Sequence, residues 1–286
     1  ATRSASGSML ALFSEKIENM VVSSADLSNS DKTEGFLKNS KPFKKGDFSG
    51  GFLHAGVSEL TMACIMNGMA LHGGIIPVCG TFFVFSDYMK PAFRMSALMR
   101  QQVIYVWTHD AFRVGEDGPT HQPVEHELQV RLMEALKNHK GKNSMLVLRP
   151  ADVDETTVAW KMALENQDTP TALILSRQNV KNLPRKESKY NEALGATKGA
   201  YIVKDCEGTA DIILLASGSE VSTLVAATEL LESRANLNVR IVSVPSEGLF
   251  FSQPESYIRS VIDYNLPIFG LTAGLPVTLE GLVAGD

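Results

Sequence analysis

The stretch Ile75–Thr108, IIPVCGTFFVFSDYMKPAFRMSALMRQQVIYVWT, contains the pattern that decides the fold. It begins with an apolar run, Ile75–Val78, continues with helical periodicity over Tyr88–Leu98, and ends with a second apolar, β-branched run, Val103–Thr108. Short apolar runs of this kind predict strands that are buried on both faces, which is typical of parallel sheets. A strand, a helix and a strand in succession therefore predict a parallel α/β unit.

The same alternation extends in both directions from this stretch. Strands are expected at Met20–Ser23, Met145–Leu148 and Thr171–Leu175, and helices along the stripe Met9, Leu10, Phe13 and Ile17, over Glu59–Leu71, and from the capping-box pattern Asp152-x-x-Glu155 to Leu164. Residues 1–180 are therefore expected to form one α/β domain. Such sheets bind ligands in the loops beyond the carboxyl ends of their strands.

The pattern changes after residue 180. Residues 181–197 are polar and show no clear period, which predicts a linker. Residues 198–286 predict a second, smaller α/β domain, with strands at Asp211–Leu215, Val239–Val244 and Pro267–Leu271 and helices at Glu220–Leu231 and Ser256–Ile262. We expect this domain to be truncated, because roughly 90 residues are few for a complete α/β domain. The start at Ala1, without methionine, indicates excision or processing.

Length, charge and cysteine content exclude several classes of protein. The 286 residues carry a net charge of −5, whereas a nucleic-acid-binding protein needs a clustered basic face. No apolar run reaches the ~18 residues of a membrane span, and the N-terminus has no signal-peptide pattern. The three cysteines are widely spaced, which indicates free thiols in a reducing cytosol. We therefore expect a cytoplasmic protein without nucleic-acid or membrane partners.

One loop concentrates the residues suited to catalysis. Gly115–Pro123, GEDGPTHQP, follows Thr108-His109-Asp110 at the end of a predicted strand. Histidine titrates near neutrality, so His109 and His121 in one cleft suit proton transfer to and from hydroxyl and carbonyl groups. Asp117 is placed to accept hydrogen bonds from substrate hydroxyls. The alternative for either histidine alone is a turn residue that satisfies backbone groups.

This loop resembles a known family. Gly115–Glu125, GEDGPTHQPVE, is similar to the motif GEDGPTHQPxE of transketolases and their dihydroxyacetone-synthase relatives. Four further motifs follow the family's order: Arg3 in ATR, SADL at 24–27, GTFFVF at 80–85 and LSRQN at 175–179. The likeness covers residues 1 to about 180 and continues more weakly to the end. It implies a thiamine-diphosphate-binding (pyrimidine-domain) fold followed by a smaller transketolase C-terminal-like domain.

The resemblance assigns roles around the cofactor. It implies that Glu59 hydrogen-bonds a ring nitrogen of the aminopyrimidine, that Phe82 and Phe85 flank that ring, and that Tyr88 closes the edge of the pocket. From the residues alone, a first-turn carboxylate favoured by the helix dipole is the simpler explanation of Glu59. The aromatic run is equally explained as core packing, or as a wall on which a flat ring stacks.

Phosphate recognition is predicted from arginines. The guanidinium group matches phosphate oxygens in a bidentate way, and Arg177 directly follows a predicted strand. The resemblance adds Arg3, Ser30 and His109 as sugar-phosphate contacts. Where many members have asparagine after this serine, the sequence has Asp31, which adds a negative charge.

Two further features have alternatives. The lysines at 38, 41, 44 and 45 form either a substrate-attracting rim or a solvated loop, and the loop is the commoner case. Ser217-Gly218-Ser219, at a predicted strand-to-helix turn, either binds an anion on backbone N–H groups or is a tight turn.

The resemblance also implies what the chain lacks. The sequence contains nothing similar to the family's GDG…N segment, where Mg²⁺ or another divalent cation bridges the cofactor diphosphate to the protein. We therefore expect half a site, completed by a homodimeric partner or by a missing N-terminal domain or chain. The implied function is transfer of a two-carbon ketol group between sugar phosphates in the pentose phosphate pathway. The alternatives are dihydroxyacetone synthase and a non-catalytic assembly subunit.

Overall fold

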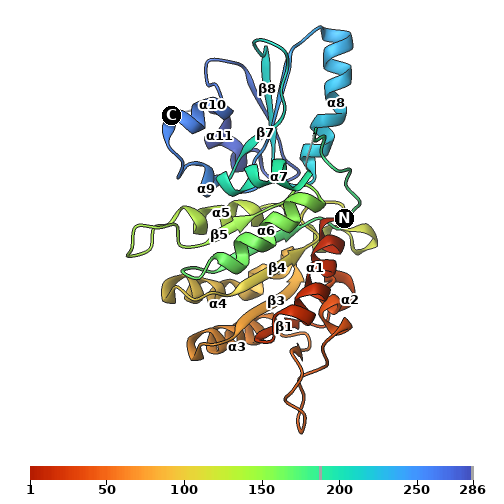
Figure 1. The fold of residues 1–286 in the computed structure, drawn as a ribbon, viewed down its shortest axis with the longest axis vertical. Helices are drawn as coiled ribbons and strands as arrows, with labels where there is room; N and C mark the ends of the chain where they lie inside the picture. Colours follow the sequence, from red (N-terminus) through yellow and green to blue (C-terminus); the bar gives the residue numbers. More distant parts are fainter. Residues whose placement is uncertain (187–188, 285–286) are drawn as a thin grey trace.

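The computed structural model describes residues 1–186 and 189–284, which form two α/β units. Figure 1 shows the first unit below and the second above, with the N-terminus at their junction. The first unit is built on a six-stranded sheet and the second on a four-stranded sheet. Among the residues that the structure describes, no helix is both long and apolar enough to cross a membrane.

The first sheet has the strand order β2-β1-β3-β4-β6-β5, and its strand pairs are parallel. The strands are β1 (Met20–Ser24), β2 (Phe52–His54), β3 (Ile76–Phe82), β4 (Ile104–Thr108), β5 (Leu146–Leu148) and β6 (Thr171–Leu175). Phe82 pairs with Thr108, and Thr108 pairs with Leu175. Because the pairs are parallel, the residues after Phe82, Thr108 and Leu175 emerge along one edge of the sheet.

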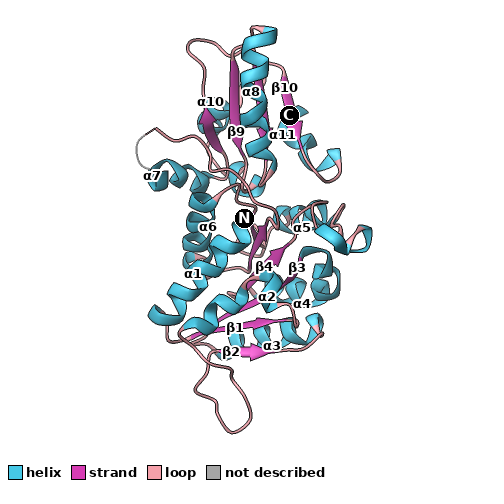
Figure 2. Cartoon of the chain, turned by 90° about the vertical axis from the view of Figure 1, so that its right-hand side faces the viewer, coloured by secondary structure: helices cyan, strands magenta, loops and turns pink. Residues whose placement is uncertain are grey.

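Helices cover both faces of the first sheet (Figure 2). They are α1 (Thr2–Lys16), α3 (Glu59–His72), α4 (Ser86–Met99), α5 (His126–Ala135) and α6 (Val153–Glu165); shorter helices are α2 (Ser28–Asp31) and η1 (Thr33–Lys38). Alternate residues of β4 point to the two opposite faces of the sheet. Tyr105 and Trp107 pack with α3, α4 and α5, whereas Ile104 and Val106 pack with α1 and α6.

The beginning of α1 is bonded to the end of β6. The Thr2 N–H donates to Ser176 Oγ at 3.1 Å, and the Ser176 N–H donates to Thr2 Oγ1 at 2.7 Å. Thr2 and Ser176 are both buried. These bonds bring the next residues along each segment, Arg3 and Arg177, to the same edge of the sheet.

The second sheet has the order β10-β8-β9-β7. Its strands are β7 (Tyr201–Lys204), β8 (Ile212–Ala216), β9 (Val239–Ser243) and β10 (Ile268–Leu271), and its helices are α8 (Glu220–Ala235), α9 (Glu247–Phe250), α10 (Glu255–Val261), η6 (Pro276–Leu279) and α11 (Glu280–Ala284). The pairs β10–β8 and β8–β9 are parallel, and β7 is antiparallel to β9. The prediction of two α/β units with mostly parallel sheets is confirmed.

Differences from the prediction concern short elements. The edge strands β2 and β7 were not predicted, and β3 runs four residues further than Val78. The segment predicted as a linker contains α7 (Lys189–Ala193) and η5 (Leu194–Lys198). The cap of α6 is confirmed, because the Glu155 N–H donates to Asp152 Oδ1 at 2.9 Å. The Glu155 carboxylate accepts from the Ala151 N–H, one residue before the position that a capping box uses.

Candidate active site

His109 lies at the carboxyl edge of the first sheet, directly after β4. Its φ is +62°, a left-handed conformation that is uncommon for residues other than glycine, although histidine adopts it more often than most, and the residue is 2 % exposed. Its Nδ1 lies 3.0 Å from Thr108 Oγ1. Burial, followed by the positive charges of Arg3 and Arg177 and by His121, lowers the pKa of His109 to about 3. The imidazole is therefore neutral near pH 7, with one donor and one acceptor nitrogen.

An aromatic wall stands next to His109. Phe82, the last residue of β3, has its ring centroid 3.8 Å from that of His109. Phe85 is nearly parallel to Phe82, with centroids 5.9 Å apart and an interplanar angle of 8°. His121 meets Phe85 edge-on at 5.3 Å. Tyr88, 63 % exposed, lies 5.9 Å from Phe85 on the outer side.

Glu59 brings a buried carboxyl to the same region. It is the first residue of α3 and is 8 % exposed. Thr81 Oγ1 donates to Glu59 Oε1 at 3.4 Å, a long hydrogen bond. Thr81 is the last but one residue of β3, so the carboxyl lies at the same carboxyl edge of the sheet as Phe82. Thr81 belongs to the quoted motif at 80–85, but sequence reasoning gave it no role.

Two guanidinium groups form the basic end of the site. Arg3 Nη1 donates to the Ser30 carbonyl oxygen at 2.5 Å. Burial and, to a smaller degree, the charge of Arg177 lower the pKa of Arg3, so the two cations are close enough to repel. Arg177 lies 3.7 Å from Glu116 Oε2. Gly115, with φ of +82°, lets Arg177 approach, because a Cβ there would lie 2.5 Å from Nη2. Because the ion pair of Arg177 with the exposed Glu116 is long, two adjacent guanidinium groups here favour a bound anion.

Asp31 is buried beside Arg3, at the end of α2. It is 1 % exposed and accepts from Ser24 Oγ at 2.6 Å, from Thr33 Oγ1 at 2.7 Å and from the Thr33 N–H at 2.8 Å. Burial raises its pKa to about 6 despite these bonds. The charge of the Asp31 carboxylate raises the pKa of Arg3 and so offsets part of the lowering described above.

Most of the predicted site residues meet along one edge. A continuous set of contacts and charge interactions joins Arg3, Ser30, Phe82, Phe85, His109, His121 and Arg177, and Thr81 connects Glu59 to it. Ser30 takes part through its carbonyl rather than its hydroxyl. Asp117, in the short helix η3 (Gly115–Asp117), is exposed at the rim, as is Tyr88.

The lysine-rich segment lies at the other edge of the sheet. Lys41, Lys44 and Lys45 are in the loop that enters β2, and this loop adjoins the amino ends of β1 and β3. Lys41 forms an ion pair with Asp47 at 2.9 Å. The interpretation as a solvated loop is therefore favoured over a substrate-attracting rim.

Side chains of the first unit form hydrogen bonds with the turn at Ser217–Ser219. The Ser217 carbonyl accepts from Arg149 Nη1 at 3.0 Å, and Ser219 Oγ donates to Asp110 Oδ2 at 3.3 Å. Both serines are buried. These contacts favour a structural turn over an anion site.

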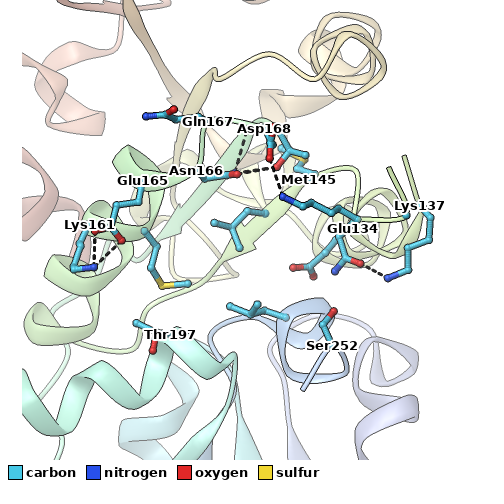
Figure 3. Close-up of a pocket in the computed structure, with 17 residues that line it drawn as sticks. Glu134, Lys137, Met145, Lys161, Glu165, Asn166, Gln167, Asp168, Thr197 and Ser252 are labelled. Carbon is cyan, nitrogen blue, oxygen red and sulfur yellow. Dashed lines mark hydrogen bonds and ion pairs between the residues drawn. The ribbon is translucent and has the colours of Figure 1, made fainter. Parts of the chain in front are cut away.

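A groove of about 970 Å³ lies between the two units at the amino ends of β5 and β6 (Figure 3). Its charged side chains largely pair with one another: Lys161 with Glu165 at 2.6 Å, and Lys142 with Asp168 at 2.8 Å. The groove is large, but its charged groups are mostly paired with one another and do not converge on a common point. We therefore place the candidate active site at the carboxyl edge of the sheet.

Comparison with known families identifies both units. A family model described as "Transketolase, pyrimidine binding domain" matches residues 1–182. A second, described as "Transketolase-like TK C-terminal domain", matches residues 199–286.

Individual proteins agree with these matches. A curated transketolase from Halalkalibacterium halodurans is 47 % identical over 92 % of this chain, and the chain spans 37 % of its length. The structure of a transketolase from Leishmania mexicana matches 98 % of this chain and 39 % of its own, with a TM-score of 0.88 and 39 % identity. A Pichia stipitis transketolase, solved in complex with sedoheptulose-7-phosphate, matches 95 % of this chain and 38 % of its own, with a TM-score of 0.83 and 37 % identity.

Proposed function

The chain belongs to the transketolase family, and from this membership we propose that it supplies the pyrimidine-facing and sugar-phosphate-facing half of a thiamine-diphosphate-dependent ketol transferase. The proposed reaction moves a two-carbon ketol group from a ketose phosphate to an aldose phosphate, as in the pentose phosphate pathway. One observation carries the proposal: the buried His109 ring lies 3.8 Å from that of Phe82, between ring centroids, and close enough to Arg3 and Arg177 for their charges to lower its pKa.

The residues beside the aromatic wall fit the cofactor's pyrimidine. Glu59 is buried, yet the hydrogen bond that it accepts from Thr81 Oγ1 is a long one, at 3.4 Å, so its carboxyl has capacity for a ring nitrogen. Phe82 and Phe85 offer apolar surface to a flat ring. When bound, thiamine diphosphate supplies the nucleophilic carbon for this chemistry. We propose that Mg²⁺ and the diphosphate are held by a different domain.

The basic end fits the phosphate of a sugar. Arg3 and Arg177 provide forked donors that match phosphate oxygens; the bond to Ser30 orients Arg3, and the absence of a side chain at Gly115 leaves room for Arg177. The likeness to a transketolase solved with sedoheptulose-7-phosphate supports a sugar phosphate as the ligand.

The histidines fit the hydroxyl groups of the sugar. His109 is neutral near pH 7, so its ring binds hydroxyl groups as a donor or acceptor without adding charge. His121 lies beyond Phe85 on the exposed side, next to the turn that carries Asp117. We assign hydroxyl binding to all three, and proton transfer at the reacting carbon atoms to a histidine of this pair.

The outer face of α3 indicates a protein partner next to the site. Leu60, Cys64, Ile65, Gly68 and Leu71 are exposed on it, and no charged residue lies between Glu59 and His72. A helix that is apolar on all sides is normally buried. A Cβ added at Gly68 would meet nothing, although glycine costs about 1 kcal/mol relative to alanine inside a helix.

We therefore propose that a partner backbone approaches α3 closely at Gly68, as expected for a homodimer in which Glu59 lies near the interface. A cytoplasmic location is also proposed, and the free cysteines Cys64, Cys79 and Cys206 support it.

The test is a ketol-transfer assay. Xylulose 5-phosphate and ribose 5-phosphate are supplied with thiamine diphosphate and Mg²⁺ to this chain alone, and to the chain mixed with the diphosphate-binding domain of a related transketolase. We expect sedoheptulose phosphate only in the mixture, and none with the Glu59→Gln variant. If the two proteins associate but form no product, the enzyme proposal is wrong and the assembly-subunit alternative is favoured.

A further inference from the structure

Arg149, directly after β5, reaches from the first unit into the second. Its Nη1 donates to the Ser217 carbonyl at 3.0 Å, and its Nη2 lies 2.6 Å from Glu220 Oε2 at the start of α8. The turn between them contains Gly218, with φ of +64°. A Cβ at that position would lie 2.7 Å from Arg149 Cγ. Glycine is therefore required both by the backbone and by the passing arginine.

The same guanidinium holds the residue next to His109. Arg149 Nη2 donates to Asp110 Oδ2 at 3.0 Å. Ser219 Oγ of the second unit donates a long bond of 3.3 Å to the same oxygen and a shorter one of 2.9 Å to Glu220 Oε1, so the two carboxylates share its single proton. The second unit therefore contacts Asp110 directly, through Ser219, and indirectly, through Arg149.

This cluster is buried and its geometry is specific. The side chains of Arg149 and Asp110 are 2 % and 1 % exposed. Nη1 of the guanidinium also lies 3.1 Å from Glu127 Oε2, so one cation serves three carboxylates. Burial raises the pKa of both Asp110 and Glu220, although Arg149 opposes that rise. Buried charges are tolerated only when their partners are fixed, so displacing any member is costly.

His109 needs such an anchor because its left-handed backbone conformation is energetically unfavourable. A left-handed conformation at a residue other than glycine persists only where the surroundings impose it. The strand β4 holds the residue from the amino side. From the carboxyl side, Asp110 is the next residue, and its carboxylate is held by Arg149 and Ser219.

We propose that the second α/β unit positions His109 for sugar binding, through Ser219 and Arg149 acting on Asp110. These are positioning residues, because each acts on His109 through its neighbour. The inference rests on the proposed function for the role of His109, but the physical link between the units holds independently of it. It gives the second unit a task in the active site, which otherwise consists of residues from the first unit alone.

The first test measures the position of His109 by NMR on the whole chain, with labelled histidine. The Phe82 ring lies 3.8 Å from the imidazole, so the ring protons of His109 are displaced from their ordinary shift. His109→Asn, which tolerates the left-handed backbone, assigns the signal by its loss. We expect Ser219→Ala and Asp110→Asn each to move this signal toward the ordinary histidine position. Ser233→Ala, the same change at an exposed site near the end of α8, is the matched control and should leave it in place.

The second test is a double-mutant cycle in the enzyme assembled with a diphosphate-binding domain. Losing one hydrogen bond to a charged group is expected to raise KM for the ketose phosphate about tenfold, equivalent to about 1.4 kcal/mol. The affinity for thiamine diphosphate should stay unchanged. Because Ser219 acts through Asp110, the double variant should be no worse than Asp110→Asn alone.

These arms separate the two proposals. If the unaltered assembly shows no ketol transfer, the proposed function fails and the NMR arm still decides the positioning role. If both variants fold and the His109 signal stays in place, the positioning role is wrong. Additive effects of the two substitutions on KM would also contradict it.

Discussion

Replacing Asp31 with asparagine removes one buried charge while keeping the shape of the side chain. The carboxyl is 1 % exposed and is surrounded by the donors of Ser24 and Thr33. Asparagine can accept both bonds from Thr33 on its oxygen and donate to Ser24 Oγ from its nitrogen. The substitution therefore tests the burial of the charge with little change in packing.

The expected gain follows from the pKa of Asp31, which burial raises from 3.8 to about 6. A raised pKa means that the folded state favours the protonated form, so ionisation destabilises the fold as the pH rises from about 4 to about 6. Each pH unit between the two values corresponds to about 1.4 kcal/mol, which gives about 3 kcal/mol at pH 7. The charge of Asp31 also stabilises the nearby Arg3 cation, and asparagine loses that attraction. The figure is therefore an upper value for the gain in stability.

The assay is urea unfolding between pH 4 and pH 8, followed by tryptophan fluorescence. Trp107 and Trp160, the two tryptophans of the sequence, are both buried in the first unit, on opposite faces of its sheet. Fluorescence therefore reports unfolding of the unit that contains Asp31. We expect Asp31→Asn to stabilise that unit by up to about 3 kcal/mol at pH 7 and by little at pH 4.

The matched control is Asp26→Asn. Asp26 is exposed in the same loop, and its φ of +62° suits asparagine, so a change within about 0.5 kcal/mol is expected. The reasoning is refuted if Asp31→Asn gains no more at pH 7 than at pH 4.

Four further predictions concern the proposed site and interface. In the assembled enzyme, Glu59→Gln should lower kcat roughly 100-fold or more while changing KM for sugar phosphates little, as steady-state kinetics would measure. Arg177→Gln should raise KM for a phosphorylated donor roughly 10- to 100-fold, with no such rise for a donor that lacks phosphate. NMR of His109 should show no titration between pH 5 and pH 8, because burial and neighbouring cations lower its pKa to about 3; a midpoint above pH 5 would contradict that environment. Gly68→Leu should weaken association in sedimentation experiments without lowering Tm; unchanged association would exclude close approach at this residue.

Elements with a strong local signal were predictable from the sequence. The buried strands β1, β4 and β6 each contain a run of at least three apolar residues, and their positions agree with prediction to within a residue. The edge strands β2 and β7 were missed because each ends in a polar residue, His54 and Lys204, and is only partly buried, whereas β5, which is as short as β2, is wholly apolar. Cys79, Gly80 and Thr81 extend β3 because β1 and β4 enclose them, a tertiary effect that the apolar pattern does not contain.

The residues of the candidate site were predictable where a local sequence motif contains them. They were unpredictable where contacts join segments that are distant in the sequence. His109, His121 and Arg177 follow strands or lie in a recognisable loop. The link from Arg149 to Ser217 joins residues 68 positions apart, and no local pattern announces it. The turn at Ser217–Ser219 illustrates the consequence: a local pattern suggested an anion site, and the chain's own arginine contacts it instead.

The bond between the beginning of α1 and the end of β6 also has a consequence for synthesis. Thr2 leaves the ribosome 174 residues before its partner Ser176. At about 5–20 residues per second, the wait is roughly 9–35 s. Phe13 waits nearly as long for Trp160, whose ring lies 5.4 Å away in the finished fold. During elongation, α1 therefore travels with an uncovered apolar stripe, a segment on which a chaperone could bind until β6 emerges.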